Sequence, residues 1–488
     1  MSIGSGLRAV SNEETGMIRR RAWVFAAAAS ALLAACGGKS GGEDAEAQVD
    51  DGPGGDEADD GAGDGTGDAT NDDTGDSDAL PLCGNNRIDP GETCDPPATC
   101  PASCDDGDAC TTDQMTGSAS ACNVLCTHPS IEGCEETFGA EPNPTGNPIG
   151  GGPGYRDIVC ETDTDGDYRV STGEELLDAL ALAESGEVIC IAGDAVIDLT
   201  GTPNNVIPAG VTLASDRGAG GSQGALIRYT YNDNGMYMTS IFVVGGDGVR
   251  VTGLRLEGEM FPEDGTGNGE SSYLVGIKAD SREGDMTGLE VDNCEMAGFA
   301  WSCVTTLNVT NVNIHHNSMH HCQARGEGYG YDIYGGNALV EANIFDFNRH
   351  DIAAGGYPGE SYEARYNIVR PSGHPIGSHH FDVHACNPND YSDDSEIGPD
   401  FIAGDLYRIH HNTFEPGGGQ QACIGIRSRP VTGAYIDHND FMGVTGDTEG
   451  GVPIWQRAYA FGNMFVTDNY WNGTLYAGDE IVWYYHPY

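Results

Sequence analysis

Short apolar segments that alternate with polar residues and end in glycine or asparagine turns recur along the second half of the chain. Between residues 331 and 384 one phrase, an aspartate followed by an aliphatic residue, occurs three times, as Asp332-Ile333, Asp351-Ile352 and Asp382-Val383. Such alternation predicts β-strands, and this stretch has no sustained apolar run at helical spacing. The pattern therefore predicts a series of short strands, one for each pass of the chain.

Asparagines in a similar setting precede most of these passes, at intervals of 24 to 45 residues: Asn293, Asn317, Asn343, Asn367, Asn412, Asn439 and Asn463. Repeats of this length with short strands are typical of a solenoid, in which each coil stacks on the one before. Equivalent residues of successive coils are then expected to lie about 4.8 Å apart. The asparagine amides are expected to hydrogen-bond from coil to coil and to hold the bend between strands.

A short helix is predicted at the start of the repetitive region. Ser171 precedes Glu174 at the spacing of a capping box, and leucine and alanine follow at helical spacing until Gly186. Two strand-like segments, 188–191 and 195–199, come directly after it. A helix over the first coil solves a physical problem, because the open end of a solenoid exposes unpaired strand edges.

This order of a helix, a strand pair and the segments 210–213 and 224–227 resembles the entry to a right-handed parallel β-helix of the pectin-lyase-like superfamily. The resemblance covers residues 159–488 and implies an all-β solenoid with a short N-terminal capping helix. Proteins of this superfamily mostly cleave polysaccharides in a groove along the parallel sheets. Many are lyases of uronic-acid polymers, and others are glycosidases with stacked aspartates.

Residues 1–36 read as an export signal, because Arg19-Arg20-Arg21, an apolar run and Leu33-Ala34-Ala35-Cys36 follow one another. The apolar run is too short to span a bilayer as a mature helix. The last motif resembles the lipobox of bacterial lipoproteins, which implies lipid attachment at Cys36 and an exported, outward-facing protein anchored in the bacterial cell envelope. Residues 37–81 are rich in glycine and aspartate, so a disordered acidic linker is expected.

Residues 82–136 contain eight cysteines: Cys83, Cys94, Cys100, Cys104, Cys110, Cys122, Cys126 and Cys134. So short an exported piece cannot bury a sufficient core, which predicts a small disulfide-rich module. Its phrases Cys83-Gly84-Asn85-Asn86 and Cys104-Asp105-Asp106-Gly107 resemble Cys-rich repeats of bacterial surface lipoproteins, which implies a spacer or interaction module. Residues 137–158, rich in glycine and proline, are expected to be a second linker.

The net charge is −54, and the chain has only two lysines, Lys39 and Lys278. Nucleic acid is therefore not an expected partner, because phosphate binding needs a basic face. A lysine base is nearly excluded as well, since Lys278 lies outside the three aspartate phrases. A monomer that meets the membrane only through its lipid anchor is expected.

Strand phase predicts that the three aspartates face outward. The aliphatic residue of each phrase takes the inward position, so alternation turns Asp332, Asp351 and Asp382 to the outer face in consecutive layers. Carboxylates stacked at about 4.8 Å repel one another by about 1 kcal/mol per pair at aqueous screening. A bound cation, a shared proton or compensation by arginine and histidine would stabilise such a column, and a fully solvated surface column is the alternative.

The neighbouring positions carry side chains suited to proton transfer and anion binding. Candidate catalytic residues are Arg349, His350, Asp351, Asp382, His384, Asp332 and His380, and candidate substrate-binding residues are Tyr331, Tyr334, Arg365 and Arg427. In a lyase the base would be Arg349 or one of the three histidines, and the acid would be one of the two tyrosines. His350 falls on the inward phase, so it reaches the groove only if the chain bends there.

Metal binding is a second prediction from the same residues. Calcium would be held by Asp351, Asp382 and the acidic insertion 386–405, with His384 as a further ligand. Zinc or manganese is the less favoured choice, held by His380, Asp382 and His384 along one strand. Side chains on one face of a strand are about 7 Å apart, so these three converge only if the strand bends.

The predicted function is a surface-anchored polysaccharide lyase that acts by β-elimination on a uronic-acid-containing glycan. An inverting glycoside hydrolase that uses Asp332, Asp351 and Asp382 without a metal is the second hypothesis. A non-catalytic glycan-binding or adhesive solenoid is the third. The insertion either walls the groove or is a solvated loop pinned by a Cys386–Cys423 disulfide.

Overall fold

The computed structural model divides into a unit formed by residues 41–136 and a second unit that contains residues 137–488. It describes residues 100, 104, 112–127, 129, 131, 137–162, 166–230, 238–259, 273–281, 286–324, 326–371, 379–389, 391, 397–415, 422–443 and 452–486. Cys36 with its export signal and the acidic stretch 37–81 lie outside these residues and stay predictions. Within the described ranges, no helix is both long and apolar enough to cross a bilayer.

The described part of the unit 41–136 is a small hairpin with disulfide bonds. β1 (Gln114–Thr116) pairs antiparallel with β2 (Leu125–Thr127), and the 3-10 helix η2 (Ala119–Ala121) lies between them in sequence. Cys104 is joined to Cys126. The other cysteines described in this unit, Cys100 and Cys122, are also disulfide-bonded.

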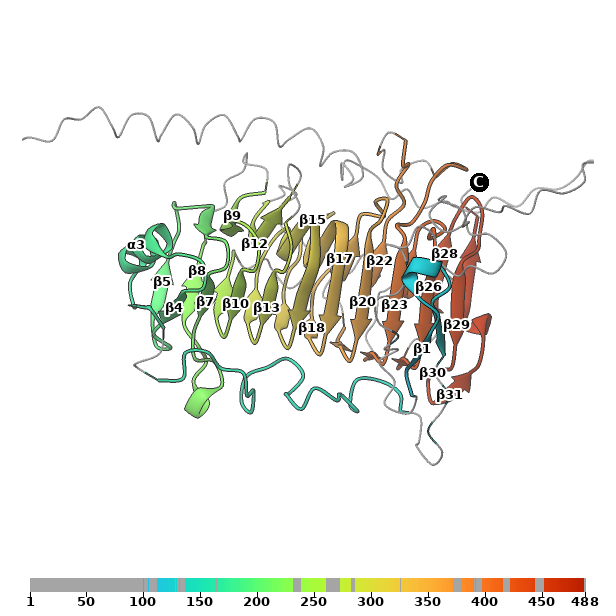
Figure 1. The fold of residues 1–488 in the computed structure, drawn as a ribbon, viewed down its shortest axis with the longest axis horizontal. Coiled ribbons are helices and arrows are strands. Elements are labelled where there is room, and N and C mark those ends of the chain that lie inside the picture. Colours follow the sequence, from blue (N-terminus) through green and yellow to red (C-terminus); the bar gives the residue numbers. More distant parts are fainter. Residues whose placement is uncertain are drawn as a thin grey trace, which may run out of the picture. The chain divides into compact units, whose positions relative to one another are not determined.

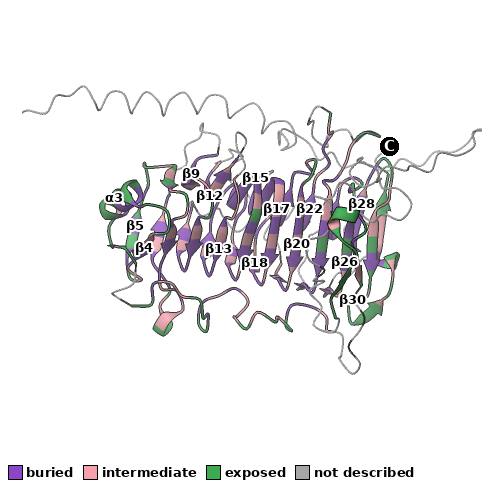
Figure 2. Cartoon of the chain, viewed as in Figure 1, coloured by how far each residue is buried: buried purple, intermediate pink, exposed green. Residues whose placement is uncertain are grey.

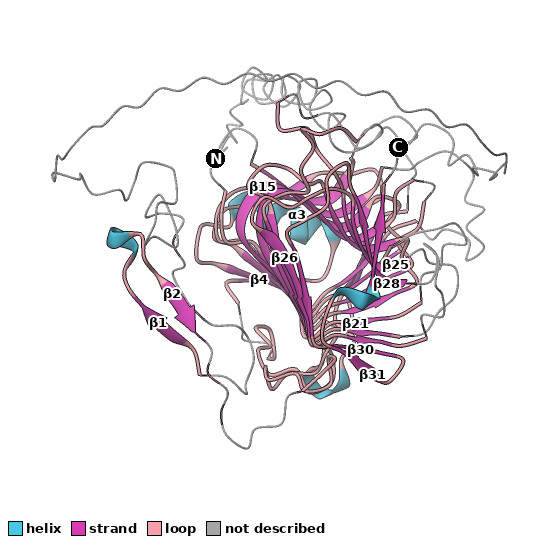
Figure 3. Ribbon diagram, turned by 90° about the vertical axis from the view of Figure 1, so that its right-hand side faces the viewer, coloured by secondary structure: helices cyan, strands magenta, loops and turns pink. Residues whose placement is uncertain are grey.

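The second unit is a solenoid of short parallel strands stacked in three ladders, which surround the interior when the unit is seen end-on (Figures 1 and 3). The first ladder contains β6 (Asn205–Ile207), β9 (Ser240–Val244), β12 (Val275–Asp280), the first parts of β15 (Ser302–His315) and β17 (Tyr329–Glu341), β19 (His350–Ala354), β22 (Phe381–Val383), β25 (Ala422–Ile426), β28 (Val452–Arg457) and β32 (Val482–Tyr485). The second contains β3 (Tyr168–Val170), β4 (Val188–Ile191), β7 (Thr212–Ala214), β10 (Arg250–Thr252), β13 (Glu290–Asp292), the remainder of β15 and β17, β20 (Ser361–Arg365), β23 (Leu406–His410), β26 (Gly433–Asp437) and β29 (Met464–Thr467). The third contains β5 (Val196–Asp198), β8 (Leu226–Arg228), β11 (Arg255–Glu257), β14 (Glu295–Ala297), β16 (Ser318–His320), β18 (Ile344–Asp346), β21 (Ile368–Val369), β24 (Thr413–Phe414), β27 (Asp440–Phe441), β30 (Asn469–Trp471) and, antiparallel at its end, β31 (Thr474–Tyr476). The predicted all-β parallel β-helix is confirmed.

Aliphatic and aromatic side chains fill the interior as columns, one residue from each coil. In the second ladder one buried column reads Leu213, Val251, Val291, Ile314, Val340, Ala364, Ile409, Ile436 and Val466. In the third ladder the rings of Phe414 and Phe441 stack with centroids 4.9 Å apart. Each such side chain contributes about 1.5–3 kcal/mol when it is fully buried. Figure 2 shows these buried positions in purple along the strands.

The helix α3 (Gly173–Leu182) packs against the first coils, at the end of the solenoid shown on the left of Figure 1. Its capping box is formed by Thr172 and Glu175, one residue later than Ser171 and Glu174. The side chains of Leu176 and Leu180 are buried beneath it. The predicted capping helix is confirmed, with its start moved by one residue.

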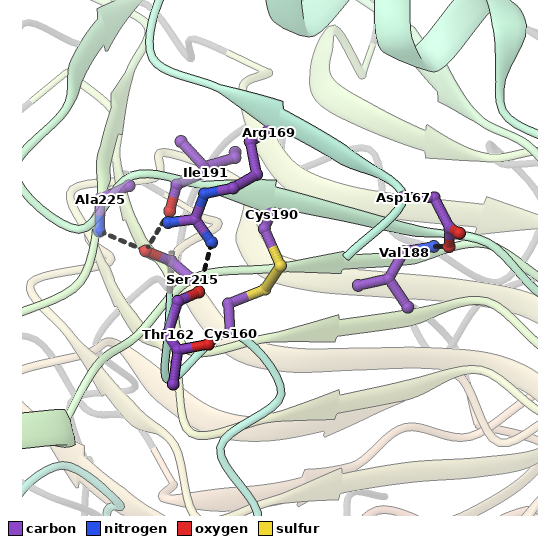
Figure 4. The surroundings of a disulfide bond; sticks show 9 residues. All are labelled: Cys160, Thr162, Asp167, Arg169, Val188, Cys190, Ile191, Ser215 and Ala225. Carbon is purple, nitrogen blue, oxygen red and sulfur yellow. Dashed lines mark hydrogen bonds between the residues drawn. A yellow bond between two sulfur atoms is a disulfide. The ribbon is translucent and has the colours of Figure 1, made fainter. Parts of the chain in front are cut away.

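A disulfide between Cys160 and Cys190 joins the chain entering the solenoid to β4 (Figure 4). Next to it the Ser215 hydroxyl donates to the Ile191 carbonyl at 2.9 Å and accepts from the Ala225 amide at 2.9 Å. The first of these bonds ties β4 to the next coil, and the second fixes the bend between β7 and β8 within that coil.

The predicted asparagine ladder runs along the bend between the second and third ladders. The backbone N–H and side-chain Nδ2 of Asn343 both donate to Asn367 Oδ1, at 2.9 and 3.0 Å. The same pattern continues through Asn317, Asn412 and Asn439. The last member is Asn469 and not Asn463, whose amide donates instead to the carbonyls of Pro430 and Val431. The step from Asn439 to Asn469 is 30 residues, so an interval of 24 residues misplaced this ladder member.

Residues 137–158, expected to be a linker, form an extended strap along this asparagine ladder. The Gly139 amide donates to the His438 carbonyl, and further along the Gly150 amide donates to the Ala342 carbonyl. The strap then reaches Asn293, whose Oδ1 accepts from the Gly152 amide at 2.8 Å. The strap is therefore part of the solenoid unit.

The start of the acidic insertion is held by backbone pairing of Cys386 with Ile402. Cys386 is disulfide-bonded, but Cys423 is a free, buried thiol. The Cys386–Cys423 disulfide is therefore wrong. The acidic residues Asp390, Asp393, Asp394 and Glu396 lie outside the described part of the chain.

Candidate functional site

The outer face of the first ladder carries one column that contains two of the three predicted aspartates. Its members, in coil order, are Thr305, Asp332, Ala353, Asp382, Gly425 and Trp455. Ala353 stands where Asp351 was expected. The prediction of three aspartates stacked in consecutive layers is therefore wrong, and Asp332 and Asp382 lie two coils apart.

Asp351 lies two residues before Ala353 in the same strand, β19. Its register neighbours are Gly330 in the coil before and His380 in the coil after. A Cβ added to Gly330 would lie 2.7 Å from the ring of the interior Phe345. The Asp351 carboxylate accepts from Asn348 Nδ2 at 2.9 Å and from His380 Nδ1 at 2.5 Å. Both Asp351 and His380 are almost completely buried. These two predicted catalytic residues therefore form a hydrogen-bonded pair of their own.

Asp382 is the centre of the charged cluster on this face. Arg427 donates to it with two bonds, Nε to Oδ1 at 2.9 Å and Nη2 to Oδ2 at 2.6 Å. The Nε2 atoms of His384 and His350 lie 3.2 and 3.4 Å from Oδ2. Burial would raise the pKa of the Asp382 carboxyl, but Arg427 and the two imidazoles outweigh it and hold this pKa well below its ordinary value.

Small neighbours in the column leave room for this convergence. Ala353 and Gly425 precede and follow Asp382, and neither has a side chain long enough to reach its carboxylate. A Cβ on Gly425 would lie 2.8 Å from the ring of His379. The absence of a side chain at Gly425 therefore leaves space for the imidazole of His379.

His350 and His379 belong to a stack of rings beside the column. The ring centroids are 5.6 Å apart for Tyr329 and His350, 6.4 Å for His350 and His379, and 4.7 Å for His379 and Trp455. His350 Nδ1 donates to the His379 carbonyl at 2.5 Å, so in the neutral ring Nε2 carries the lone pair. Burial, and then the charge of Arg349, lowers the pKa of His350 well below its ordinary value. Burial likewise lowers the pKa of His379 to about 4.

The accessible part of the cluster is formed by His384 and Arg427. Their side chains are 19% and 18% exposed, whereas Asp382 is fully buried. Backbone hydrogen bonds place Tyr334, Gly355, His384 and Arg427 in one column. A Cβ on Gly355 would lie 2.7 Å from Cδ1 of Tyr334, so the tyrosine ring lies over this glycine, on the side of His384.

Asp332 has a different environment from Asp382. Trp301 Nε1 donates to its Oδ2 at 2.8 Å, and the residue is 1% exposed. Burial raises the pKa of Asp332 well above its ordinary value, against the effect of the Trp301 hydrogen bond. Two strand spacings separate it from Asp382, which corresponds to about 9.6 Å between their backbones.

Three other predicted residues do not join the cluster. Tyr331 lies in the interior, where its hydroxyl is 2.7 Å from Thr306 Oγ1, so it cannot bind a substrate on the outer face. Arg365 lies on the second ladder and forms ion pairs there. Arg349 donates to the Gly326 carbonyl at 3.0 Å and acts on the cluster through its charge.

The predicted metal ligands do not form a compact set. Asp351 is separated from the other two and bonded to His380, and both oxygens of Asp382 are occupied by Arg427. The described residues contain one group with closely spaced ligand atoms, formed by Glu290, Asp292 and His315 on the second ladder. Arg250 and Tyr155 already occupy its Asp292 carboxylate, which leaves little room for an ion.

Sequence reasoning missed Trp301, His379 and Trp455, which support the cluster from neighbouring coils. None of them belongs to the repeated aspartate phrase. Trp455 could have been found from the strand register, because it occupies the same column as Asp382 two coils later.

No protein-family model matches the chain, and no curated protein matches its sequence. Similar solved structures include an alginate lyase from Paenibacillus sp. str. FPU-7, at 14% identity and a TM-score of 0.38 over 62% of this chain and 98% of that one. The A-module of the Azotobacter vinelandii mannuronan C-5 epimerase AlgE6 matches at 12% identity and 0.25 over 62% and 99%. A capsular polysaccharide depolymerase tailspike of the Acinetobacter baumannii bacteriophage Fri1 matches at 10% and 0.26 over 61% and 54%. At these identities and scores the likeness does not extend to a reaction.

Proposed function

We propose that the solenoid is a polysaccharide lyase that cleaves a uronic-acid-containing glycan by β-elimination. The observation that carries this proposal is the cluster around Asp382, in which the accessible groups are an imidazole, His384, and a guanidinium, Arg427. An imidazole suits the removal of a proton next to a carboxylate, and a fixed positive charge beside it stabilises the negative charge that develops.

His384 is the proposed base. Asp382 Oδ2 lies 3.2 Å from its Nε2 and accepts a hydrogen bond from the N–H there, so the proton acceptor of the neutral ring is Nδ1. Removal of the C5 proton of the uronate forms the C4–C5 double bond as the C4–O bond breaks. Tyr334, which lies two coils before His384 in the same column with Gly355 between them, is the proposed acid that protonates the leaving oxygen.

Arg427 has two roles in this proposal. Its double hydrogen bond fixes the Asp382 carboxylate, which in turn orients His384. Its charge also lies beside the place where a uronate carboxylate has to be neutralised before C5 becomes acidic. Arg427 already bonds both oxygens of Asp382, and Asp390, Asp393, Asp394 and Glu396 of the insertion lie outside the described residues, so no step of the proposed reaction runs through a metal.

An inverting glycoside hydrolase is the second candidate, and one observation favours it. Burial raises the pKa of Asp332 while Arg427 lowers that of Asp382, and the backbones of the two residues lie on one face about 9.6 Å apart. Inverting enzymes use an acid and a base separated by about 6.5–9.5 Å. The arginine bonded to Asp382 counts against this role, because it makes the carboxylate a poor base.

The test is to incubate the mature protein with a panel of acidic and neutral glycans, with and without a chelator. A lyase produces unsaturated uronates, which absorb ultraviolet light, and the chelator is expected to leave the rate unchanged. New reducing ends without this absorbance would instead establish the hydrolase. Binding without any turnover would overturn both and support a non-catalytic glycan-binding solenoid.

We also propose that the enzyme is displayed on the bacterial cell envelope through a lipid on Cys36. The motif Leu33-Ala34-Ala35-Cys36 supports this proposal. The wild-type protein is expected in the membrane fraction and the Cys36→Ala variant outside it. Equal fractionation of the two proteins would contradict the anchor without affecting the proposed reaction.

A further inference from the structure

Two buried cysteines lie side by side inside the solenoid without being bonded. The Sγ atoms of Cys303 and Cys322 are 2.9 Å apart, and both residues are fully buried. An S–S bond is about 2.0 Å long, so closing the bond requires a movement of less than about 1 Å. The other free cysteines described in the structure, Cys294 and Cys423, are equally buried but have no such sulfur neighbour.

We infer that Cys303 and Cys322 form an intramolecular disulfide in the mature protein. Each thiol loses one hydrogen, and the two electrons and two protons pass to a disulfide of a thiol oxidase or of oxidised glutathione, which becomes two thiols. Export to an oxidising compartment, which the N-terminal signal predicts, supplies such oxidants. Burial raises the pKa of the Cys303 thiol well above its ordinary value, so exchange is slow once the chain has folded. The bond therefore forms during folding.

This bond would close one coil of the solenoid on itself. Cys303 lies near the start of β15, and Cys322 follows β16 at the bend that leads into the next coil. The intervening stretch passes through the first, second and third ladders, and the two residues are 19 positions apart. Closing a loop of this size restricts the unfolded chain and stabilises the folded one.

The bend at Cys322 also supports the neighbouring coil next to the candidate site. The Cys322 amide donates to Asn348 Oδ1 at 3.0 Å, and the Arg349 amide donates to the Cys322 carbonyl at 3.0 Å. Asn348 in turn donates to Asp351, and Arg349 precedes His350. A disulfide at this bend would therefore fix the residues from which His350 projects toward Asp382.

The experiment is thiol mapping on the full chain, purified without reductant. The protein is unfolded in the presence of an alkylating reagent, digested and examined by mass spectrometry. Peptides with Cys303 and Cys322 are expected to be linked and lighter by two hydrogens, whereas Cys294 and Cys423 are expected to be alkylated. Alkylation of Cys303 and Cys322 as complete as that of the two control cysteines would overturn the inference.

A second measurement tests the bond through stability. A reductant is expected to lower the Tm of the Cys294→Ala/Cys423→Ala control by about 4 °C more than that of the Cys303→Ala/Cys322→Ala variant, which has already lost the bond. Equal reductant effects on the two variants would contradict the bond. Both measurements are independent of glycan cleavage, so they hold or fail separately from the proposed lyase activity.

Discussion

The outer faces of the first and second ladders carry the same kinds of charged side chain, but they distribute them differently. In the second ladder one column reads Thr252, Asp292, His315, Glu341, Arg365, His410 and Asp437, with charge in nearly every coil. In the first ladder the column from Thr305 to Trp455 has a charge in only two coils, at Asp332 and Asp382, with Ala353 between them. On the second face, charged and titratable side chains therefore follow one another from coil to coil, whereas on the first face they are concentrated around Asp382.

The second face shows how such residues behave when their role is structural. Arg250 donates twice to Asp292, and Arg365 bonds both Glu341 and Glu363. The strap 137–158 lies against the start of this column, where Tyr155 adds a further hydrogen bond to Asp292. Here each of these carboxylates has a cation as its partner. On the first face one carboxylate meets an arginine and two histidines, which is an excess of positive and titratable groups that stability alone does not require.

The largest effect is expected from Asp382→Asn, which removes the carboxylate at the centre of the charged cluster on the first face. Loss of this charge leaves Arg427 and the histidines without their counter-ion in a buried site, which costs about 3–5 kcal/mol of folding free energy. Activity is expected to fall by about 100-fold or more as His384 loses its orientation. Chemical denaturation and the uronate absorbance assay measure the two effects.

Glu341→Gln on the second face is the matched control for this prediction. It removes a carboxylate that is bonded to Arg365 at 2.7 Å and is partly exposed. A loss of about 1 kcal/mol without any change in activity is expected. If both variants lost only stability, the contrast between a functional and a structural face would fail.

The next largest effect concerns the pH dependence of the strap. His316 bonds Thr145 of the strap at 2.8 Å, and burial, followed by the charge of His315, lowers its pKa to about 4 from 6.5. Asp292 and Asp157 act in the opposite direction. Between these two pH values the unfolded chain binds a proton that the folded chain does not, so stability falls as the pH falls, by up to about 3 kcal/mol.

His316→Gln tests this dependence, because glutamine keeps a hydrogen-bonding group but does not titrate. Denaturation curves between pH 7 and pH 4 are expected to show a smaller loss of stability for the variant than for the wild-type protein. The difference between the two profiles isolates His316 from the other groups that titrate in this range. Parallel profiles would mean that His316 binds its proton equally well in the folded and the unfolded chain.

The fold was predictable because its signals repeat in every coil. Alternating strands and asparagines about one coil apart identify a solenoid even if one member is misassigned, as Asn463 was. The helix boundary moved by only one residue for the same reason, since Thr172 and Glu175 are as good a capping pair as the pair before them.

The candidate site was less predictable, because it depends on register. Asp351 slips by two residues relative to Asp332 and Asp382, and a shift of two leaves the alternation of faces unchanged. Asp351 instead pairs with His380, and the His350 imidazole lies 3.4 Å from Asp382. Local sequence contains the right residue types for the site, but the register between coils decides which of them meet.

A third prediction compares equivalent histidines on the two faces. His384→Gln is expected to lower kcat by about 100-fold, because glutamine cannot accept the C5 proton, while stability changes little at this partly exposed position. His315→Gln, which removes a partly buried imidazole bonded to Glu290 at 3.1 Å, is expected to leave kcat unchanged. Loss of activity in the second variant, or its retention in the first, would assign the base elsewhere.

The smallest effect is expected where the strap meets the second face. Tyr155→Phe removes a hydroxyl that donates to Asp292 at 2.8 Å, but Arg250 and Thr252 still satisfy that carboxylate. The loss is therefore limited to one hydrogen bond to a charged group, about 1.5 kcal/mol. Tyr435→Phe, at a 38% exposed tyrosine on the same ladder, is the control and is expected to change stability by less than about 0.5 kcal/mol. Neither variant should alter glycan cleavage, because the proposed site lies on the first face and both residues are remote from it. A fall in activity with Tyr155→Phe would show that the strap also acts on the site.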